Sequence, residues 1–158
     1  MDDATFVYVT YIRTTPEKLW QALTTREFLS QYWSGGPAGV DAQPGAAVKW
    51  EIGGEVRDLG QVVLESEPYR RLAYRWHNYQ RDYQEMFGWT DEQFAELVKE
   101  KISKVTFDIE PAGPTVKLTV THDDFVPGSE MLKGVSGGWP LILASLKSLL
   151  ETGEPLSF

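Results

Sequence analysis

The spacing of apolar residues near the start of the chain predicts a strand and then a helix. The run TFVYVTYI, residues 5–12, is dense in β-branched and aromatic residues, which is typical of a strand. Apolar residues then recur at helical spacing over residues 16–24. Thr15 is placed to cap this helix and Pro16 suits its first position, so we expect the helix to begin there.

A second short helix is expected directly after the first. Thr24 and Glu27 have the spacing of a capping box, which satisfies free N–H groups at the start of a helix. The apolar pattern continues to Tyr32, and the glycine-rich and proline-rich run SGGPAG then ends it. The sequence therefore predicts two short helices after the first strand, followed by a loop.

From residue 46 onward the apolar period becomes two, which is typical of strands with one buried face. In VKWEI, for example, Val48, Trp50 and Ile52 alternate with charged residues. Five further strands are predicted from such alternation or from short apolar runs between turn signals. They cover residues 48–52, 59–66, 71–77, 104–110 and 116–122, and PAGP joins the last two as a hairpin.

The stretch NYQRDYQEMFGWTDEQFAELVKEK interrupts the predicted strands. Thr90 and Gln93 resemble a capping box, and the apolar residues after them form one narrow stripe. We therefore expect a short inserted helix near residues 91–99 and interpret residues 80–100 as a flap.

A long helix is predicted at the end of the chain, because apolar residues of 139–150 share one face at a period of 3.6. Pro140 would bend a helix already under way. Helical spacing nevertheless extends back through EMLKGVSGG, so we expect the helix to begin near Glu130 and to kink at Pro140. Gly137 and Gly138 are expected to allow close packing of this helix, as the hinge of a lid.

Antiparallel strands with one apolar face need a cover on one side only, and one long amphipathic helix supplies most of it. We therefore expect an α+β fold in which a curved antiparallel sheet of about six strands wraps around the long C-terminal helix. No repeat, low-complexity tract or linker divides the chain, so residues 1–158 are expected to form a single domain.

Composition excludes several classes of function. The 158 residues include no cysteine, which excludes disulfides and thiolate chemistry and favours a reducing compartment. A net charge of −8 repels a nucleic-acid backbone. No apolar run reaches the roughly 20 residues of a membrane span. We expect a cytoplasmic protein without a nucleic-acid or membrane partner, and the many aromatic residues suggest an aromatic-lined interior.

Several motifs together resemble one known family, the activator of heat shock protein 90 ATPase homologue-like family. They are YIRTTPEKLWQALTTREFLSQYW, RLAYRW, VTFDIEP, VKLTVTHDDF and GGWPLILASLKSLLETG, spread over about residues 5–153. The resemblance implies membership of the START/SRPBCC superfamily and its helix-grip fold. It also implies a cavity between the concave face of the sheet and the final helix, often used for an apolar or aromatic small molecule, and an unidentified ligand or a stress-related role.

The residues expected to bind such a ligand lie on inward faces or border the cavity, with Tyr74 and His122 as the polar groups that orient the guest. They are Trp33, Trp50, Tyr74, Trp76, Phe107, Leu118, His122, Trp139 and Leu143. The same residues could also form a packed core that needs no ligand. The first hypothesis is a non-catalytic binding module whose flap controls access and whose Trp139 reports occupancy.

Two other hypotheses remain open at this stage. In an enzyme of the cyclase or dehydratase type, His122 or Tyr74 would transfer a proton to a substrate folded in the cavity. His122 also has a simpler interpretation, as a strand-end histidine hydrogen-bonded near the DDF turn. A chaperone could instead interact with an outer surface, with stimulation of its ATPase activity.

The remaining polar residues predict little chemistry. His77 is out of phase with its strand and is expected on the polar face or near an edge, and Asp123 and Asp124 are expected in a solvated turn. Two separated histidines do not make a metal site, so we expect neither a metal nor a cofactor. An exposed edge strand would allow a homodimer as well as a monomer.

Overall fold

The sheet is built from strands β1 to β7, in the spatial order β1-β7-β6-β5-β4-β3-β2, and every neighbouring pair is antiparallel. The computed structural model describes residues 5–52, 54–77 and 79–157. The strands are β1 (Phe6–Ile12), β2 (Pro37–Val40), β3 (Ala47–Ile52), β4 (Glu55–Glu67), β5 (Arg71–Arg75), β6 (Lys104–Ala112) and β7 (Thr115–Asp123). The helices are α1 (Pro16–Thr24), α2 (Arg26–Tyr32), α3 (Arg81–Phe87), α4 (Asp91–Leu97) and α5 (Glu130–Thr152).

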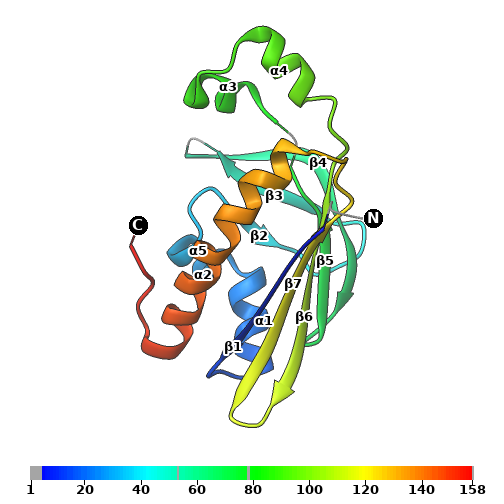
Figure 1. Ribbon diagram of the computed structural model, residues 1–158. Coiled ribbons are helices and arrows are strands. Elements are labelled where there is room, and N and C mark those ends of the chain that lie inside the picture. The colour runs from blue at the N-terminus through cyan, green and yellow to red at the C-terminus, as the bar shows by residue number, and fades with distance from the viewer. Residues whose placement is uncertain (1–4, 53, 78, 158) are drawn as a thin grey trace.

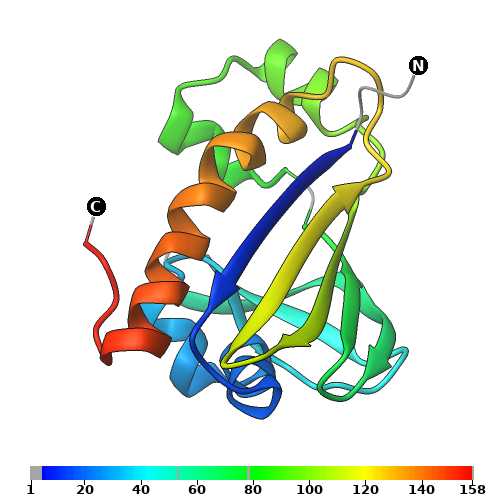
Figure 2. The same ribbon diagram turned by 60° about the horizontal axis from the view of Figure 1, so that its bottom comes forward.

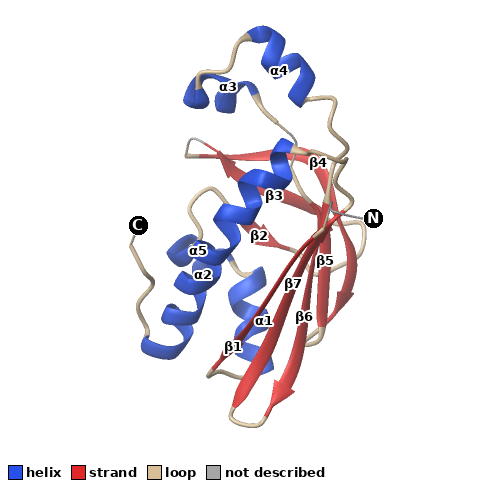
Figure 3. Cartoon of the chain, in the orientation of Figure 1, coloured by secondary structure: helices blue, strands red, loops and turns tan. Residues whose placement is uncertain are grey.

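The long helix α5 crosses the concave face of the curved sheet (Figures 1 and 3). Helices α1 and α2 lie near its C-terminal half, while α3 and α4 lie at the end of the molecule where α5 begins, as Figure 2 shows from a second direction. This is the predicted α+β arrangement, with a sheet gripping one helix. In the part of the chain that the structure describes, no helix is long and apolar enough to cross a membrane.

The core forms because the inward faces of the strands meet the apolar stripe of α5. In β7 the inward residues Val116, Leu118, Val120 and His122 are each at most 1% exposed, and the residues between them are half-buried. The buried residues of α5 are Val135, Trp139, Leu143, Ser145, Leu146 and Leu149. Burial of each large apolar side chain stabilises the fold by about 1.5–3 kcal/mol relative to exposure, so this shared interface holds helix and sheet together.

The sheet has seven strands rather than the expected six, because β2 lies in the stretch predicted as a loop. β2 is an edge strand that pairs with β3 alone, with Pro37 opposite Trp50 and Val40 opposite Val48. Proline is tolerated at a sheet edge because its missing N–H need not bind a neighbour. The local sequence therefore predicts a loop in this segment, but its pairing with β3 makes it a short strand.

Two helix caps differ in how well they were predicted. Thr15 caps α1 as expected, accepting a hydrogen bond from the N–H of Lys18 at 3.2 Å. The capping box of Thr24 and Glu27 is wrong, because α2 begins one residue later with Thr25 at its N-cap. The Thr24 hydroxyl instead donates to the carbonyl of Trp20 at 2.8 Å, inside α1.

Helix α5 begins at Glu130 as predicted and continues through Pro140. The expected packing role of the glycines is wrong. A Cβ added at Gly137 or Gly138 would meet no atom within 4 Å outside its immediate helical surroundings. These two positions therefore leave open space beside the helix instead of allowing a close approach.

Candidate functional site

A cavity of about 1510 Å³ lies where the insertion, the N-terminal half of α5 and the ends of β3 and β5 meet. The insertion contributes Tyr79, Tyr83, Phe87, Trp89, Glu92, Gln93, Glu96, Leu97 and Glu100. α5 contributes Glu130, Met131, Gly134, Val135, Gly138, Trp139 and Ile142. The remaining wall is formed by Ser34, Gly35, Glu51, Gly54, Trp76 and His77. A largely apolar concavity with a few polar groups is typical of a small-molecule site.

Trp76 is the centre of an aromatic cluster behind and within the cavity wall. Its ring centroid lies 5.0 Å from that of Trp50, 5.4 Å from Trp139 and 5.8 Å from Trp33. Such stacked, tilted and edge-to-face contacts add about 0.5–1.5 kcal/mol per pair beyond burial. The cluster therefore fixes the orientation of Trp76 and Trp139, the two of its members that line the cavity.

Of the nine residues predicted to bind a ligand, Trp76 and Trp139 line this cavity. The other seven lie in the buried layer behind it, each no more than 7% exposed. They are Trp33, Trp50, Tyr74, Phe107, Leu118, His122 and Leu143. The structure thus contains both features that the sequence left open, a packed core between sheet and helix and an open cavity beside it.

His122 holds Trp139 in place through a hydrogen-bonded chain. The indole N–H of Trp139 donates to His122 Nδ1 at 3.0 Å, and Ser103 Oγ lies 2.8 Å from His122 Nε2. An indole N–H can only donate, so Nδ1 is unprotonated and the proton of the neutral ring is on Nε2, donating to Ser103. Burial, and then the proximity of His77, lower the pKa of His122 to about 3. His122 is therefore neutral, with both ring nitrogens in use.

Three buried donors in or next to the aromatic cluster have no hydrogen-bond partner among the described residues. They are Trp50 Nε1, Tyr74 OH and Trp76 Nε1. Burial raises the pKa of Tyr74 well above its ordinary value, so its hydroxyl stays protonated. Tyr74 does not line the cavity, whereas Trp76 does.

His77 lies in the cavity wall, whereas the sequence had placed it on the polar face or near an edge. β5 ends at Arg75, so the alternation of the strand no longer applies two residues later. The His77 ring lies 4.9 Å from that of Trp50 and 5.5 Å from that of Tyr83. The imidazole therefore joins the sheet to the insertion.

The turn after β7 is ion-paired. Asp124 has a φ of 67°, and its carboxylate accepts a 2.9 Å hydrogen bond from Arg75 and lies 3.6 Å from Lys101. The hydrogen bond from Arg75 lowers the pKa of Asp124. Among the described residues no group of three histidines, aspartates or glutamates could hold a metal ion.

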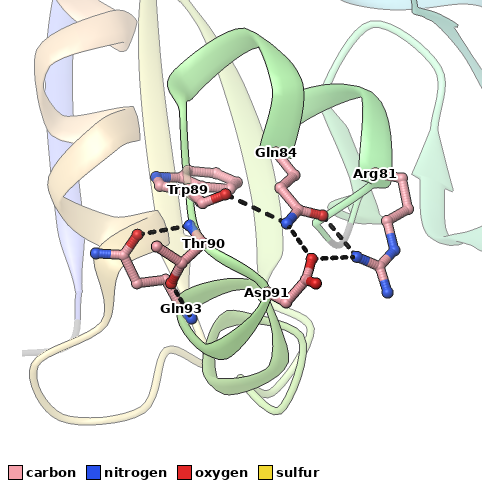
Figure 4. Close-up of polar contacts among 6 residues, drawn as sticks. All are labelled: Arg81, Gln84, Trp89, Thr90, Asp91 and Gln93. Carbon is pink, nitrogen blue, oxygen red and sulfur yellow. Dashed lines mark hydrogen bonds and ion pairs between the residues drawn. The ribbon is translucent and has the colours of Figure 1, made fainter.

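The insertion is a helical corner, shown in Figure 4. The capping box of Thr90 and Gln93 is confirmed, with N–H to side-chain oxygen distances of 2.8 and 3.1 Å. The predicted helix is α4, Asp91–Leu97, and the sequence missed α3 before it. Tyr83 and Phe87, four residues apart, were the available signal for α3.

Gln84 ties α3 to α4. Its side-chain N–H groups donate to the carbonyl of Trp89 at 3.2 Å and to Asp91 Oδ1 at 2.8 Å, while its oxygen accepts from Arg81 at 2.6 Å (Figure 4). At the other end of the insertion, Glu100 accepts from Ser129 Oγ at 2.5 Å and so joins the insertion to the start of α5.

We expect Gln84→Ala to loosen this corner without unfolding the protein. The loss of its hydrogen bonds should lower the free energy of local opening by about 1–2 kcal/mol. Native-state hydrogen exchange would show faster exchange in α3 and α4 and unchanged exchange in β6 and β7. Glu85→Ala, an exposed neighbour on α3, is the matched control. Equal exchange in both variants would contradict a positioning role for Gln84.

A sequence model described as Activator of Hsp90 ATPase homolog 1-like protein matches residues 13–151. The chain belongs to this family. Membership confirms the resemblance read from the motifs, and the family is part of the SRPBCC group, which binds hydrophobic ligands. Among curated protein sequences none matches the chain significantly.

Solved structures share the fold. The Aha1 dimer from Colwellia psychrerythraea is 22% identical, with a TM-score of 0.67 over 94% of this chain and 97% of its own. Protein MLL2253 from Mesorhizobium loti is 25% identical, with a TM-score of 0.69 over 92% of this chain and 96% of its own. DynU16, from the dynemicin biosynthetic locus, is 19% identical, with a TM-score of 0.65 over 98% of this chain and 49% of its own.

Proposed function

We propose that this protein binds an apolar or aromatic small molecule, without chemical conversion, in the cavity between the insertion and α5. The observation that carries the proposal is the open cavity of about 1510 Å³ whose wall contains Trp76, Trp139, Tyr79, Tyr83 and Trp89. A concave wall that contains this many aromatic residues, beside a packed core, favours an apolar guest. Membership of a hydrophobic-ligand-binding family supports the same function.

The position of the proton-transfer candidates supports binding over a cyclase or dehydratase. A general acid or base must come within hydrogen-bond reach of its substrate. Neither Tyr74 nor His122 is among the residues that line the cavity, and His122 already uses both nitrogens. Its role in this proposal is to position Trp139.

Gly138 offers a direct test, because it lines the cavity and has open space beside it, whereas Gly137 has the same open space but does not line the cavity. Gly138→Leu should fill part of the cavity and displace the guest from it. The apolar contacts that the guest loses should be worth about 1.4 kcal/mol or more, which weakens binding at least about tenfold. Gly137→Leu should bind normally. Both should remain folded, because leucine favours the helix over glycine by about 0.5–1 kcal/mol.

The measurement is a saturable change in tryptophan fluorescence on titration with an uncharged probe, 2-naphthylmethanol. Trp139 and Trp76 are expected to report its entry. Equal affinity in the two leucine variants would place the guest elsewhere, and the absence of saturable binding to the unmodified protein would overturn the proposal.

A further inference from the structure

The ionic side chains of the cavity wall carry one sign of charge. The described lining residues include five glutamates and neither lysine nor arginine. They are Glu51, Glu92, Glu96, Glu100 and Glu130. Three of them have cation partners, Arg26, Lys99 and Lys133, whose side chains are each at least 64% exposed and do not line the cavity. The concave surface itself therefore presents negative charge.

The surface between these carboxylates is aromatic, and the faces of indole and phenol rings attract cations. Tyr79 and Trp89 pack edge to face at 5.4 Å in the wall formed by the insertion. Burial raises the pKa of Tyr79, and the charges of Glu100 and Glu130 raise it further, so its hydroxyl lies in their negative field. The insertion already contains one cation–π contact, in which the Arg81 guanidinium lies 4.4 Å from the Phe94 ring centroid.

We propose that the guest is an organic cation, with an aromatic or apolar body and a protonated amine or quaternary ammonium group. This inference rests on the proposed function, because it assigns a charge to the ligand of the same cavity. A concave site with one sign of charge and low-dielectric walls concentrates the opposite charge. The aromatic faces add cation–π attraction in the same place. The same field disfavours fatty acids, phosphates and other anionic guests.

The test compares three probes that share one aromatic body and differ in charge. They are (2-naphthylmethyl)trimethylammonium, 2-naphthylmethanol and 2-naphthylacetate, titrated calorimetrically into the full chain at pH 7.5. The ammonium compound should bind about tenfold more tightly than the alcohol, and the carboxylate more weakly than either. The preference should shrink as salt is raised, because the Debye length falls from about 10 Å at 0.1 M to about 3 Å at 1 M.

The double variant Glu92→Gln with Glu96→Gln removes two carboxylates from the wall at exposed helical positions, so folding should be unaffected. It should reduce the preference for the ammonium probe about threefold, through weaker Coulomb attraction. Glu85→Gln, a carboxylate on α3 outside the wall, should leave it unchanged.

The outcomes separate the two proposals. If the alcohol binds and the ammonium compound binds no better, or the carboxylate binds best, the cation assignment is wrong and the binding function stands. If none of the three binds, both fail. An undiminished preference for the ammonium probe in the double variant would contradict the role given to the carboxylates.

Discussion

Replacement of Trp139 by alanine is expected to lower the free energy of unfolding by about 3–5 kcal/mol, the range for a buried aromatic reduced to a methyl group. Trp139 is 1% exposed, and its ring lies 5.2 Å from that of Trp33, 5.4 Å from Trp76 and 5.8 Å from Phe107. Its removal would leave a void where α5 meets the sheet. Chemical denaturation should report the loss, and the midpoint of thermal unfolding should fall by about 10 °C.

Two further variants separate packing from hydrogen bonding. Trp139→Phe keeps a ring but removes the N–H that His122 Nδ1 accepts, so it should cost about 1–3 kcal/mol. Leu141→Ala changes a residue of the same helix that is 49% exposed and should cost no more than about 0.5 kcal/mol. A loss for Trp139→Ala close to that of Leu141→Ala would mean that Trp139 does not join the helix to the sheet.

The elements that could be predicted from the sequence are those with a clear local period of apolar residues. The inward phase of Leu118 and His122 follows from alternation along β7 alone, and the stripe of α5 follows from its own spacing. β2 and α3 were missed because their local signals are weak. Pro37 and Gly39 indicate a break, and only the pairing of β2 with β3 across the sheet makes this segment a strand.

The site was harder to predict, because an inward-facing residue can line a cavity or fill a core. Trp50 and Trp76 share an inward phase, yet Trp50 is fully buried and Trp76 lies at the cavity. The difference depends on where the insertion folds, which spacing along the strands does not encode. Ser103 could not have been matched to His122 either, since the two lie on different segments that only the fold brings together.

Because of His122, we also expect the free energy of unfolding to fall markedly in mild acid. The indole N–H that points at Nδ1 leaves no room for a proton there, and the ring is fully buried. Its pKa is about 3 in the folded protein, against about 6.5 in an unfolded chain. Above pH 6.5 the ring is neutral in both states and its contribution to stability is complete. Below that pH the unfolded state binds a proton that the folded state does not, so stability falls as pH falls toward 3.

The slope expected from this one residue approaches about 1.4 kcal/mol per pH unit well below pH 6.5, and the loss between pH 6.5 and 4.5 is about 2 kcal/mol. The measurement is the free energy of unfolding by denaturant at several pH values, compared with His122→Gln, whose amide can donate and accept but does not titrate. Hydrogen-bond partners lower the pKa values of Asp124 and Glu151, so their contributions to stability are also lost in acid. That loss is the same in the unmodified protein and in His122→Gln. His122→Gln should be less stable at pH 7.5, and its deficit should shrink as pH falls. Parallel curves from pH 7.5 to 4.5 would show that His122 accepts a proton in the folded state, which would contradict its role as the neutral acceptor for Trp139.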